Sequence, residues 1–426
     1  MNKPPLKILW LVNIVLPAVA EDFGCERTPF GGWLTLMTER LSKLPGYDIG
    51  IAMRAPVAKL ESREKDGIRY YAVPQSSTDR FDISQQDCDA VLAGFCPDIL
   101  HAEGSEMAYT RRFLRSWDGL KLLSLQGVIN GYEAYELGRL PIGAMLVSLD
   151  PREVLTALAL LFRKRFQFNP RLALEKQTLG MVDHIMGRTQ WDRAHAYALN
   201  PHASYHHCGR ILRKEFHQRL WTRSDVEDHS IFIGSAGSAR KGAHIALRAL
   251  AQLRESFPGT RLYIAGDSPA SVPRWSAKRY VGYPAYLTRL IEQLDLTEHV
   301  IFTGLLSAAE MAQRMQRSHV FNLPSLIENS PNTLGEAMLM GVPSIAAYAG
   351  GVTSMAADEE EVLLYRADDP ALLAWQVKRL FDDDALCARL SAAARARANR
   401  THDANKNVTA QVAVYEQIIS DCPRVP

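Results

Sequence analysis

Residues 321–347 read FNLPSLIENSPNTLGEAMLMGVPSIAA and have the pattern of a buried strand, a loop and a helix. Phe321–Leu323 is typical of a strand end, and Leu334–Met340 has apolar residues at helical spacing. Between them, Ser330 is a natural N-cap and Pro331 suits the first helical position. Unbonded amide groups at such a helix start bind anions. The stretch therefore predicts an α/β fold with a ligand at this helix start.

Two carboxylates flank the predicted helix start. Glu328 precedes it, and Glu336 follows after seven intervening residues. Because helical side chains tilt toward the N-terminus, Glu336 can lean back over the start. The segment then offers amide donors for an anion and two acceptors for hydroxyl groups, which suits a phosphorylated sugar or a nucleotide. Two glutamates at this spacing also fit an ordinary exposed pair, but the strand, the cap and the Gly341-Val342-Pro343 turn favour a functional site.

The Glu-x7-Glu pattern with its Gly-Val-Pro turn resembles a known family. It is similar to the retaining glycosyltransferases of the GT-B fold (family 4-like, glycosyl transferases group 1), which include sucrose and glycogen synthases and bacterial surface-polysaccharide enzymes. The resemblance implies that Glu336 holds the ribose of a nucleotide-sugar and that Glu328 contacts the donor sugar. Amides around Asn332–Leu334 are implied to meet the diphosphate. The donor-binding residues implied in this segment are Glu328, Asn329, Ser330, Asn332, Thr333, Leu334 and Glu336.

A basic pair follows another predicted strand. Ile231–Gly237 is a short apolar run ending in small residues, Arg240-Lys241 comes next, and Ala243–Arg254 has helical periodicity. An arginine fork and a lysine point charge suit a diphosphate. The family resemblance implies that Arg240 and Lys241 bind the leaving diphosphate. The glycines at 237 and 242 have Walker A spacing, but Ala-His stands where that motif requires Lys-Ser/Thr.

Composition narrows the class of protein. The 426 residues exceed what one core usually serves, and a 47% hydrophobic fraction with 23% charged residues is ordinary for a globular protein. A net charge of +2 argues against a dedicated nucleic-acid partner. The six cysteines have no CxxC pairing, which predicts a cytoplasmic location with free thiols. Asp382–Asp384 superficially resembles a metal-binding Asp-x-Asp, but it opens a predicted surface helix, so we predict no catalytic metal and no cofactor besides the nucleotide-sugar.

The N-terminal segment supports two interpretations. Residues 7–20, with Lys3 before them and an Ala-x-Ala ending, could pass for a short signal peptide. The same run is typical of the first strand of a parallel sheet that is buried on both faces. An amphipathic helix over residues 34–44 follows, so we favour the strand. No run of the sequence reaches the ~18 apolar residues that a membrane span needs.

The first half of the chain alternates strands and helices, which predicts a doubly wound sheet with ligands beyond the carboxyl ends of its strands. The Gly31-Gly32 pair resembles the family's glycine-rich loop near donor and acceptor. Gln126 falls where many relatives have a histidine, so no role of that histidine is carried over. From their position in the first half of the chain alone, we predict that three residues line the acceptor side of the cleft. These residues, called the acceptor-side group below, are Arg188, Thr189 and Asp192.

Residues 151–171 form an atypical insert. Apolar residues at helical spacing surround the basic triplet 163–165. A core or inter-domain helix with a solvated basic end fits this pattern, and so does a helix resting on an anionic membrane at the inner face. The second alternative would suit a lipid-linked acceptor.

The sequence predicts two Rossmann-like, doubly wound domains facing across a cleft, as in the GT-B fold. Residues 1–221 form the acceptor-binding domain, and residues 222–403 form the nucleotide-sugar-binding domain. The polar run 222–229 is the predicted linker. By resemblance, a final helix at 404–420 crosses back onto the first domain.

The function implied is a retaining, metal-independent hexosyltransferase. It moves a sugar from a UDP- or GDP-type donor to a hydroxyl of a glycan or lipid-linked acceptor, in polysaccharide or glycoconjugate biosynthesis. No protein nucleophile is assigned. Two alternatives stay open: a nucleotide-sugar epimerase of the same fold, and a non-catalytic nucleotide-sugar-binding protein. The sequence leaves the base, the sugar, the acceptor and the oligomeric state undetermined.

Overall fold

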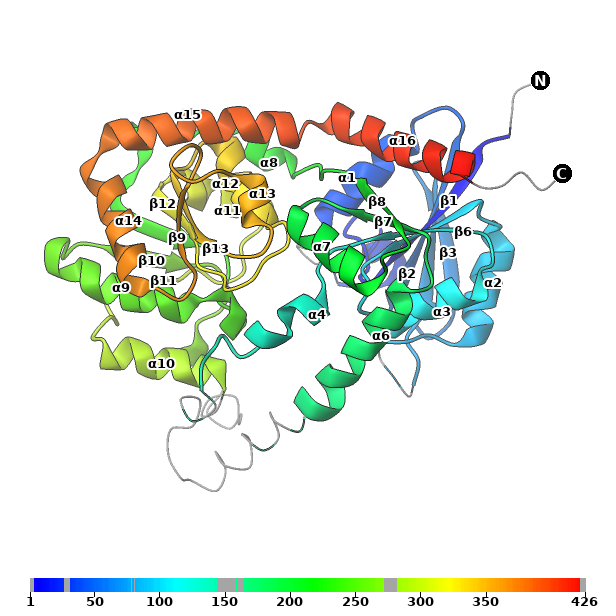
Figure 1. Cartoon of the computed structure of the whole chain (residues 1–426), viewed down its shortest axis with the longest axis horizontal. Helices are drawn as coiled ribbons and strands as arrows, with labels where there is room; N and C mark the ends of the chain where they lie inside the picture. The colour runs from blue at the N-terminus through cyan, green and yellow to red at the C-terminus, as the bar shows by residue number, and fades with distance from the viewer. Residues whose placement is uncertain are drawn as a thin grey trace. The chain divides into compact units, whose positions relative to one another are not determined.

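The computed structural model describes residues 4–26, 31–77, 79, 81–141, 143, 158, 162, 164–271 and 282–421. The chain divides into two compact units (Figure 1). The first unit comprises Met1–Gly131, Pro170–Leu212 and His402–Pro426. The second unit comprises Tyr132–Asn169 and Arg213–Thr401. The first unit is therefore assembled from three separate stretches of chain.

The first unit is an α/β structure around a mainly parallel sheet. Its strands are β1 (Leu6–Val12), β2 (Tyr47–Ala55), β3 (Glu61–Lys65), β4 (Ile68–Pro74), β5 (Ile99–Glu103), β6 (Leu120–Ser124), β7 (His184–Gly187) and β8 (Ser204–His207). Its helices are α1 (Gly32–Leu41), α2 (Gln85–Phe95), α3 (Ala108–Ser116), α6 (Asn169–Leu179), α7 (Gln190–Leu199) and α16 (Ala404–Asp421), and α4 (Ile129–Tyr132) leads out of the unit.

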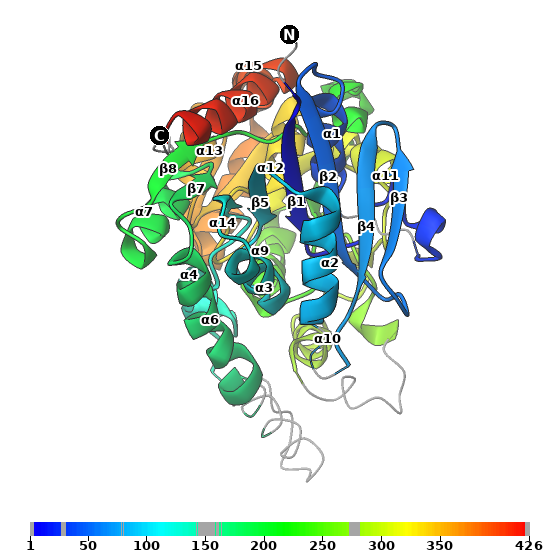
Figure 2. The ribbon, with the colours of Figure 1, turned by 90° about the vertical axis from the view of Figure 1, so that its right-hand side faces the viewer.

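Both faces of the first sheet are buried at its central strands, such as β1 and β5. The strand order is β3-β4-β2-β1-β5-β6-β7-β8, and β3 pairs antiparallel at the outer edge (Figure 2). Alternate residues of β1 enter different cores: Ile8 packs with residues of α1 and α16, whereas Leu9 packs with residues of α2 and α3. This explains the continuous apolar run of β1, because a strand covered on both faces needs apolar side chains at every position.

The second unit is a parallel α/β structure. Its strands are β9 (Glu227–Ile233), β10 (Arg261–Ile264), β11 (Val300–Phe302), β12 (Ser318–Leu323), β13 (Ser344–Tyr348) and β14 (Leu363–Arg366). Its helices are α8 (Lys214–His217), α9 (Ala243–Ser256), α10 (Tyr283–Gln293), α11 (Ala308–Gln316), α12 (Asn332–Met340), α13 (Val352–Met355), α14 (Pro370–Asp382) and α15 (Asp384–Thr401).

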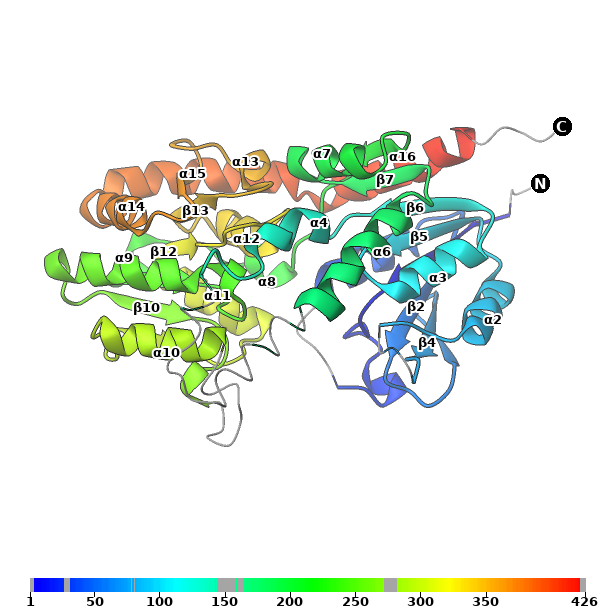
Figure 3. The same cartoon turned by 60° about the horizontal axis from the view of Figure 1, so that its bottom comes forward.

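The second sheet places β9 and β12 side by side at its centre. The strand order is β11-β10-β9-β12-β13-β14, and the described strands of this sheet all pair in parallel. Helix α9 packs against α10 and α14, and α12 packs against α8 and α15; Figure 3 shows α9 beside α14. Because parallel strands end at one edge, the loops after β9 and β12 meet there.

The α/β prediction with two Rossmann-like sheets is confirmed, but several elements differ from the sequence-based expectation. The predictions lacked β3, β7, β8 and β14, which are short or polar. The predicted linker 222–229 overlaps β9, which begins at Glu227. The chain passes between the units after Gly131, Asn169, Leu212 and Thr401, whereas the sequence predicted one boundary at 221 and a return at 404. The final helix, α16, belongs to the first unit.

Most of the insert 151–171 lies outside the described residues, so its membrane interpretation stays a prediction. Of its apolar side chains, Leu158, Phe162 and Phe166 are described and exposed, and the rings of the two phenylalanines lie 4.4 Å apart. None of the helices in the described part of the chain is both long and apolar enough to span a membrane.

Candidate functional site

The segment 321–347 forms the predicted strand, loop and helix, with a shift at the helix start. Strand β12 is buried throughout and ends at Leu323, and α12 begins at Asn332. The N-cap is Pro331, with φ −68° and ψ 112°, and no side chain caps the helix. The prediction of Ser330 as N-cap was therefore wrong by one residue. The fixed φ of proline suits this last extended position as well as the first helical one.

The start of α12 presents backbone amides. The amide of Leu334 donates to the carbonyl oxygen of Pro331 at 3.1 Å, so it is already used within the turn. The amide of Thr333, among the described residues, has no hydrogen-bond partner. Both Asn332 and Thr333 are partly exposed. An anion at this helix end can therefore receive the Thr333 amide and the positive end of the helix dipole.

Glu328 and Lys241 form an ion pair that links the two predicted donor segments. The Lys241 Nζ lies 2.5 Å from the Glu328 Oε1. The carboxylate is 12% exposed and the lysine side chain is 31% exposed, so the pair lies at a surface with access for a ligand. The amide of Leu326 also donates to the carbonyl oxygen of Arg240 at 2.8 Å. The loops after β9 and β12 are thus joined by both side-chain and backbone bonds.

Two glycines allow the loop after β12 to lie against neighbouring backbone. Gly242 has φ +72°, and a Cβ there would lie 1.8 Å from the Pro324 carbonyl oxygen. Gly350 has φ +54°, and a Cβ there would lie 2.0 Å from the Glu328 carbonyl oxygen. The same oxygen accepts a hydrogen bond from the Gly351 amide at 2.9 Å. Only glycine fits at these contacts, which fix the position of Glu328.

Glu336 is buried and paired with an arginine that the sequence did not single out. The carboxylate is 1% exposed, and it accepts two hydrogen bonds from Arg213, with Nε to Oε1 and Nη2 to Oε2 both at 2.8 Å. Arg213 precedes α8, and its guanidinium lies 4.8 Å from the Phe216 ring centroid. Burial raises the pKa of Glu336, and the Arg213 charge opposes that rise. Arg213 therefore holds the carboxylate in a fixed, bidentate orientation.

Arg240 lies close to the segment Tyr132–Asn169, which is the first of the two stretches that form the second unit. Its Nη1 is 3.8 Å from the Glu136 Oε2, and its guanidinium is 5.3 Å from the Tyr132 ring centroid. Gly138 passes so close that a Cβ on it would lie 2.7 Å from the Ala239 carbonyl oxygen. Arg240 remains about one-third exposed. The carboxylate of Glu136 therefore lies near the charge that we predict binds a diphosphate.

The predicted donor residues of the second half are gathered at one sheet edge, and the other predicted residues lie in the first unit. Gly31 has φ +86° and caps α1, so the glycine pair forms a helix start after β1. Gln126 is half-buried, two residues after β6. The assignment of Gly31, Gly32 and Gln126 to a donor and acceptor loop stays a prediction.

The acceptor-side group divides into two kinds of residue. Thr189 and Asp192 form a reciprocal capping box at the start of α7. Asp192 is fully buried, its Oδ1 accepts from the Tyr205 hydroxyl at 2.5 Å, and its Oδ2 accepts from the Arg188 amide at 2.9 Å. These bonds assign a structural task to both capping residues. Arg188 is partly exposed and is the member of the group best placed for a ligand.

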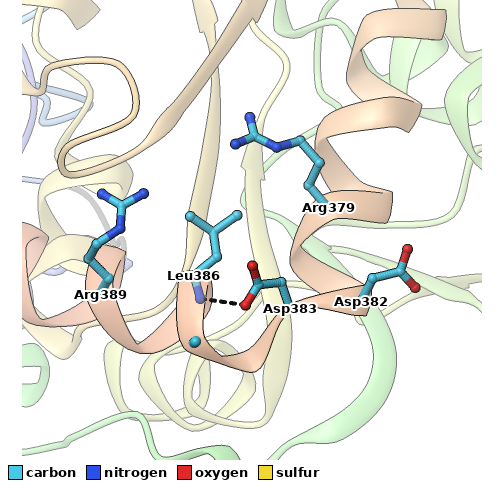
Figure 4. A pocket seen from close by; sticks show the side chains of 6 residues that line it. Arg379, Asp382, Asp383, Leu386 and Arg389 are labelled. Carbon is cyan, nitrogen blue, oxygen red and sulfur yellow. Dashed lines mark hydrogen bonds between the residues drawn. The ribbon is translucent and has the colours of Figure 1, made fainter.

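A recess at the junction of α14 and α15 is unrelated to the donor residues. Arg379, Asp382, Asp383, Leu386 and Arg389 line it (Figure 4). Asp383 accepts from the Leu386 amide at 2.8 Å, which caps α15. Both arginines bond to Glu359, through its carboxylate and its backbone oxygen. The acidic run is therefore part of a helix junction, as predicted.

Sequence reasoning missed Arg213 and Glu136. Arg213 lies 123 residues before its partner Glu336, and Glu136 lies 104 residues before Arg240. Neither belongs to a local motif, so only the fold brings them to the predicted donor residues.

Comparison with known proteins identifies the second half most clearly. Residues 217–397 match the model of the family Glycosyl transferases group 1. A D-inositol 3-phosphate glycosyltransferase from Stackebrandtia nassauensis is 30% identical over 181 residues, which cover 40% of this chain and 38% of the relative. The match thus spans well under half of that curated relative.

Solved structures extend the likeness over nearly the whole chain. Sucrose-phosphate synthase from Thermosynechococcus elongatus matches with a TM-score of 0.72 at 16% identity, covering 97% of this chain and 99% of that one. Anabaena HepE in complex with UDP matches with a TM-score of 0.67 at 16% identity, covering 97% and 100%. At such identity the likeness establishes the fold. The chain therefore has the GT-B fold, and its residues 217–397 are similar to the glycosyl transferases group 1 family.

Proposed function

We propose that this protein is a retaining glycosyltransferase that moves a hexose from a nucleotide-diphospho-sugar to an acceptor hydroxyl. The observation that carries the proposal is the ion pair of Lys241 with Glu328 in the loop before the partly exposed start of α12, where Thr333 lies. It places a cation, a hydroxyl acceptor and an amide donor at one edge of the second sheet. These are the groups that a diphosphate joined to a sugar requires.

Each donor residue has a distinct task in this proposal. Glu336 accepts hydrogen bonds from the ribose hydroxyls, while Arg213 keeps its carboxylate oriented. Glu328 accepts from a hydroxyl of the transferred sugar. Arg240 and Lys241 bind the diphosphate, and binding requires that the Glu136 carboxylate give up its place near Arg240.

The chemical step in the proposal is driven by stabilisation of the leaving group. As the bond between sugar and phosphate breaks, negative charge grows on the diphosphate oxygens. Arg240, Lys241 and the start of α12 then bind the transition state more strongly than the ground state. A departing phosphate oxygen takes the proton of the acceptor hydroxyl on the same face, which retains the anomeric configuration. The protein cations make a catalytic metal unnecessary in this scheme.

The comparisons support a nucleotide donor of the UDP type. HepE, which shares the fold, was solved with UDP and with UDP-glucose. The family match covers the residues to which we assign donor binding. By extension we propose an acceptor that is a glycan or a lipid-linked glycan, in cytoplasmic polysaccharide or glycoconjugate biosynthesis.

Nucleotide binding is the first test. Thermal unfolding is measured with UDP, GDP and ADP for wild type, Arg240→Gln, Glu336→Gln and Arg254→Gln. A ligand at a hundred times its Kd stabilises the fold by about 2.7 kcal/mol. We expect one nucleotide to stabilise wild type and the Arg254→Gln control, whose exposed pair with Asp295 lies on another part of the unit. Loss of the shift in the other two variants supports the site.

Turnover separates the proposal from its alternatives. A transferase releases nucleoside diphosphate only when an acceptor is present, apart from slow hydrolysis, and its product keeps the anomeric configuration by NMR. An epimerase changes the sugar and keeps the donor intact. A binding protein does neither. No thermal shift with any of the three nucleotides, for a folded wild type, contradicts the proposal.

A further inference from the structure

The first unit has a buried carboxylate between two arginines at the carboxyl edge of its sheet. Glu103 ends β5 and is 1% exposed. Arg188 directly follows β7, and Arg210 lies three residues after β8. Both guanidinium groups act electrostatically on Glu103. In a parallel sheet this edge is where ligands bind, and β5 lies beside β1, where the order of the strands reverses.

Neighbouring groups contact both arginines, and part of each guanidinium is buried, namely Arg188 Nε and Arg210 Nε and Nη2. The Arg188 Nη2 donates to the carbonyl oxygen of Leu125, and the Arg188 amide is fixed by Asp192. The Arg210 guanidinium lies 3.6 Å from the Trp33 ring centroid, and its carbonyl oxygen accepts from His402 at 3.0 Å. Both residues are partly exposed, unlike Glu103.

Glu103 is poorly compensated as an anion despite the two cations. Burial raises its pKa to about 7, although Arg210 and Arg188 lower it. Its Oε2 has no hydrogen-bond partner among the described residues, so a proton there displaces no existing bond. The nearest ring nitrogen, His101 Nε2, lies 3.5 Å from Oε1 and is occupied by the Ser124 hydroxyl at 2.7 Å.

The other titratable groups around Glu103 keep one charge state near neutral pH. Burial lowers the pKa of His101 to about 3 and raises the pKa of Cys208 to about 12. The pKa values of Tyr109 and Tyr415 lie well above the usual range for the same reason. The charged and titratable groups that face the carboxylate are His101, Tyr109, Arg188, Cys208, Arg210 and Tyr415. Glu103 is thus the group of this cluster that titrates near pH 7.

We propose that Arg188 and Arg210 form an oxyanion site in the first unit, which binds a phosphate, sulfate or carboxylate group of the acceptor above the buried carboxylate of Glu103. The assignment of the anion to the acceptor rests on the proposed function, whereas the anion site itself does not. An incoming anion competes with Glu103 for the two cations. Glu103 therefore takes up a proton from solvent when the anion binds.

The linkage fixes the direction of the pH dependence. Below pH 7 Glu103 is largely neutral, and both arginine charges attract an anion. Above pH 7 the carboxylate is ionised and opposes binding, so affinity falls as pH rises through about 7. We expect a roughly tenfold loss of affinity between pH 6 and pH 8.5, which corresponds to about 1.4 kcal/mol.

Sulfate is the probe, because it does not titrate in this range. Sulfate binding to the full chain is measured by calorimetric titration at constant ionic strength. Each titration is repeated in two buffers of different ionisation enthalpy, because the difference between the two binding enthalpies gives the number of protons taken up. We expect tighter binding at pH 6, with uptake of protons near pH 7. Glu103→Gln should bind with little pH dependence and, at pH 8.5, more tightly than wild type. Binding by wild type without pH dependence or proton uptake overturns the proposal and needs no variant.

Charge variants locate the site. Arg188→Gln and Arg210→Gln should each weaken sulfate binding at least tenfold, while Arg188→Lys and Arg210→Lys retain most of it if charge rather than local folding matters. Sulfate can also bind at the donor pair, so Arg240→Gln is measured in parallel. Sensitivity to Arg240→Gln alone overturns the proposal. Sulfate binding that needs Arg188, in a protein that binds no nucleotide, leaves this inference standing and contradicts the proposed function instead.

The source of the anion is separated by competition with sulfate. One arm uses glucose 6-phosphate against neutral glucose, and the other uses phosphatidylcholine vesicles with and without phosphatidylglycerol. Competition by the sugar phosphate supports a soluble anionic acceptor. Competition by the anionic vesicles supports a lipid-linked one. Failure of both to compete contradicts a role of the site in acceptor binding.

Discussion

The bidentate bond between Arg213 and Glu336 makes a single carboxylate matter for stability as well as for binding. Replacing Glu336 by Gln keeps the shape and leaves the Arg213 charge with a neutral partner. We expect Glu336→Gln to lower the free energy of unfolding by about 1–3 kcal/mol, measured by urea denaturation at pH 7.5. Lys378→Gln, which breaks an exposed pair with Asp382, should change it by less than about 0.5 kcal/mol. If Glu336→Gln and Lys378→Gln lowered the free energy of unfolding equally, burial of the Arg213–Glu336 pair would make no difference to stability.

His319 opposes folding in acid. It is fully buried in β12, and among the described residues neither ring nitrogen has a partner. Burial, with a smaller effect of Arg223, lowers its pKa to about 4. As pH falls from 6.5 toward 4, His319 becomes protonated in the unfolded chain but stays neutral in the folded protein. The free energy of unfolding therefore decreases over this pH range. The charged and titratable neighbours are Arg223, Asp228, His229 and Asp384.

A leucine at this position should therefore improve acid stability. We expect His319→Leu to be more stable than wild type by about 2 kcal/mol at pH 5, with a smaller difference at pH 7.5. Denaturation at both pH values checks this, with the exposed His202→Leu as the control. A difference that does not change with pH would mean that the His319 proton plays no part.

Among the elements, the loop between β9 and α9 depends on a close approach of its backbone at Gly242 to the backbone of the loop after β12. An alanine at Gly242 would bring its Cβ onto the Pro324 carbonyl oxygen and would hold a positive φ. We expect Gly242→Ala to displace the loop after β12 and abolish nucleotide-dependent thermal stabilisation. Gly259→Ala is the matched control, because a Cβ there meets nothing within 4 Å. Retention of the nucleotide shift in Gly242→Ala would contradict this account of the loop.

For the whole molecule, the first unit depends on a helix from the far end of the sequence. Tyr415 of α16 is fully buried, and its hydroxyl bonds to His101 Nδ1 at 2.8 Å. We expect Tyr415→Ala to destabilise the first unit by about 3–5 kcal/mol. Hydrogen exchange should quicken in β1 and α1 while β9 and β12 stay protected. Glu416→Ala, on the exposed side of the same helix, should leave all four unchanged; uniform loosening would mean that the units unfold together.

The sequence predicted those parts of the fold whose signal is local. The apolar runs of β1 and β12 were enough to predict these strands, because both strands are buried on both faces. The Gly-Val-Pro sequence was enough to predict the turn after α12, because glycine readily adopts the left-handed conformation that ends the helix. Strands β7 and β8 carry the residues HIMG and SYHH, which read as polar loops because their burial comes from distant neighbours. The two glutamates to which we assign donor binding, Glu328 and Glu336, were visible for the same local reason. Arg213 was not, since its partner Glu336 lies 123 residues further along the chain.

The return of α16 to the first unit has a consequence for synthesis on the ribosome. Every residue of the second unit precedes His402, so α16 is synthesised only after the whole of that unit. Synthesis of the first unit starts earlier, but the face of its sheet against which α16 packs stays uncovered until α16 emerges from the ribosome. Nascent chains are therefore most exposed to aggregation through their oldest part, and a chaperone that holds β1 and α1 would act late in translation.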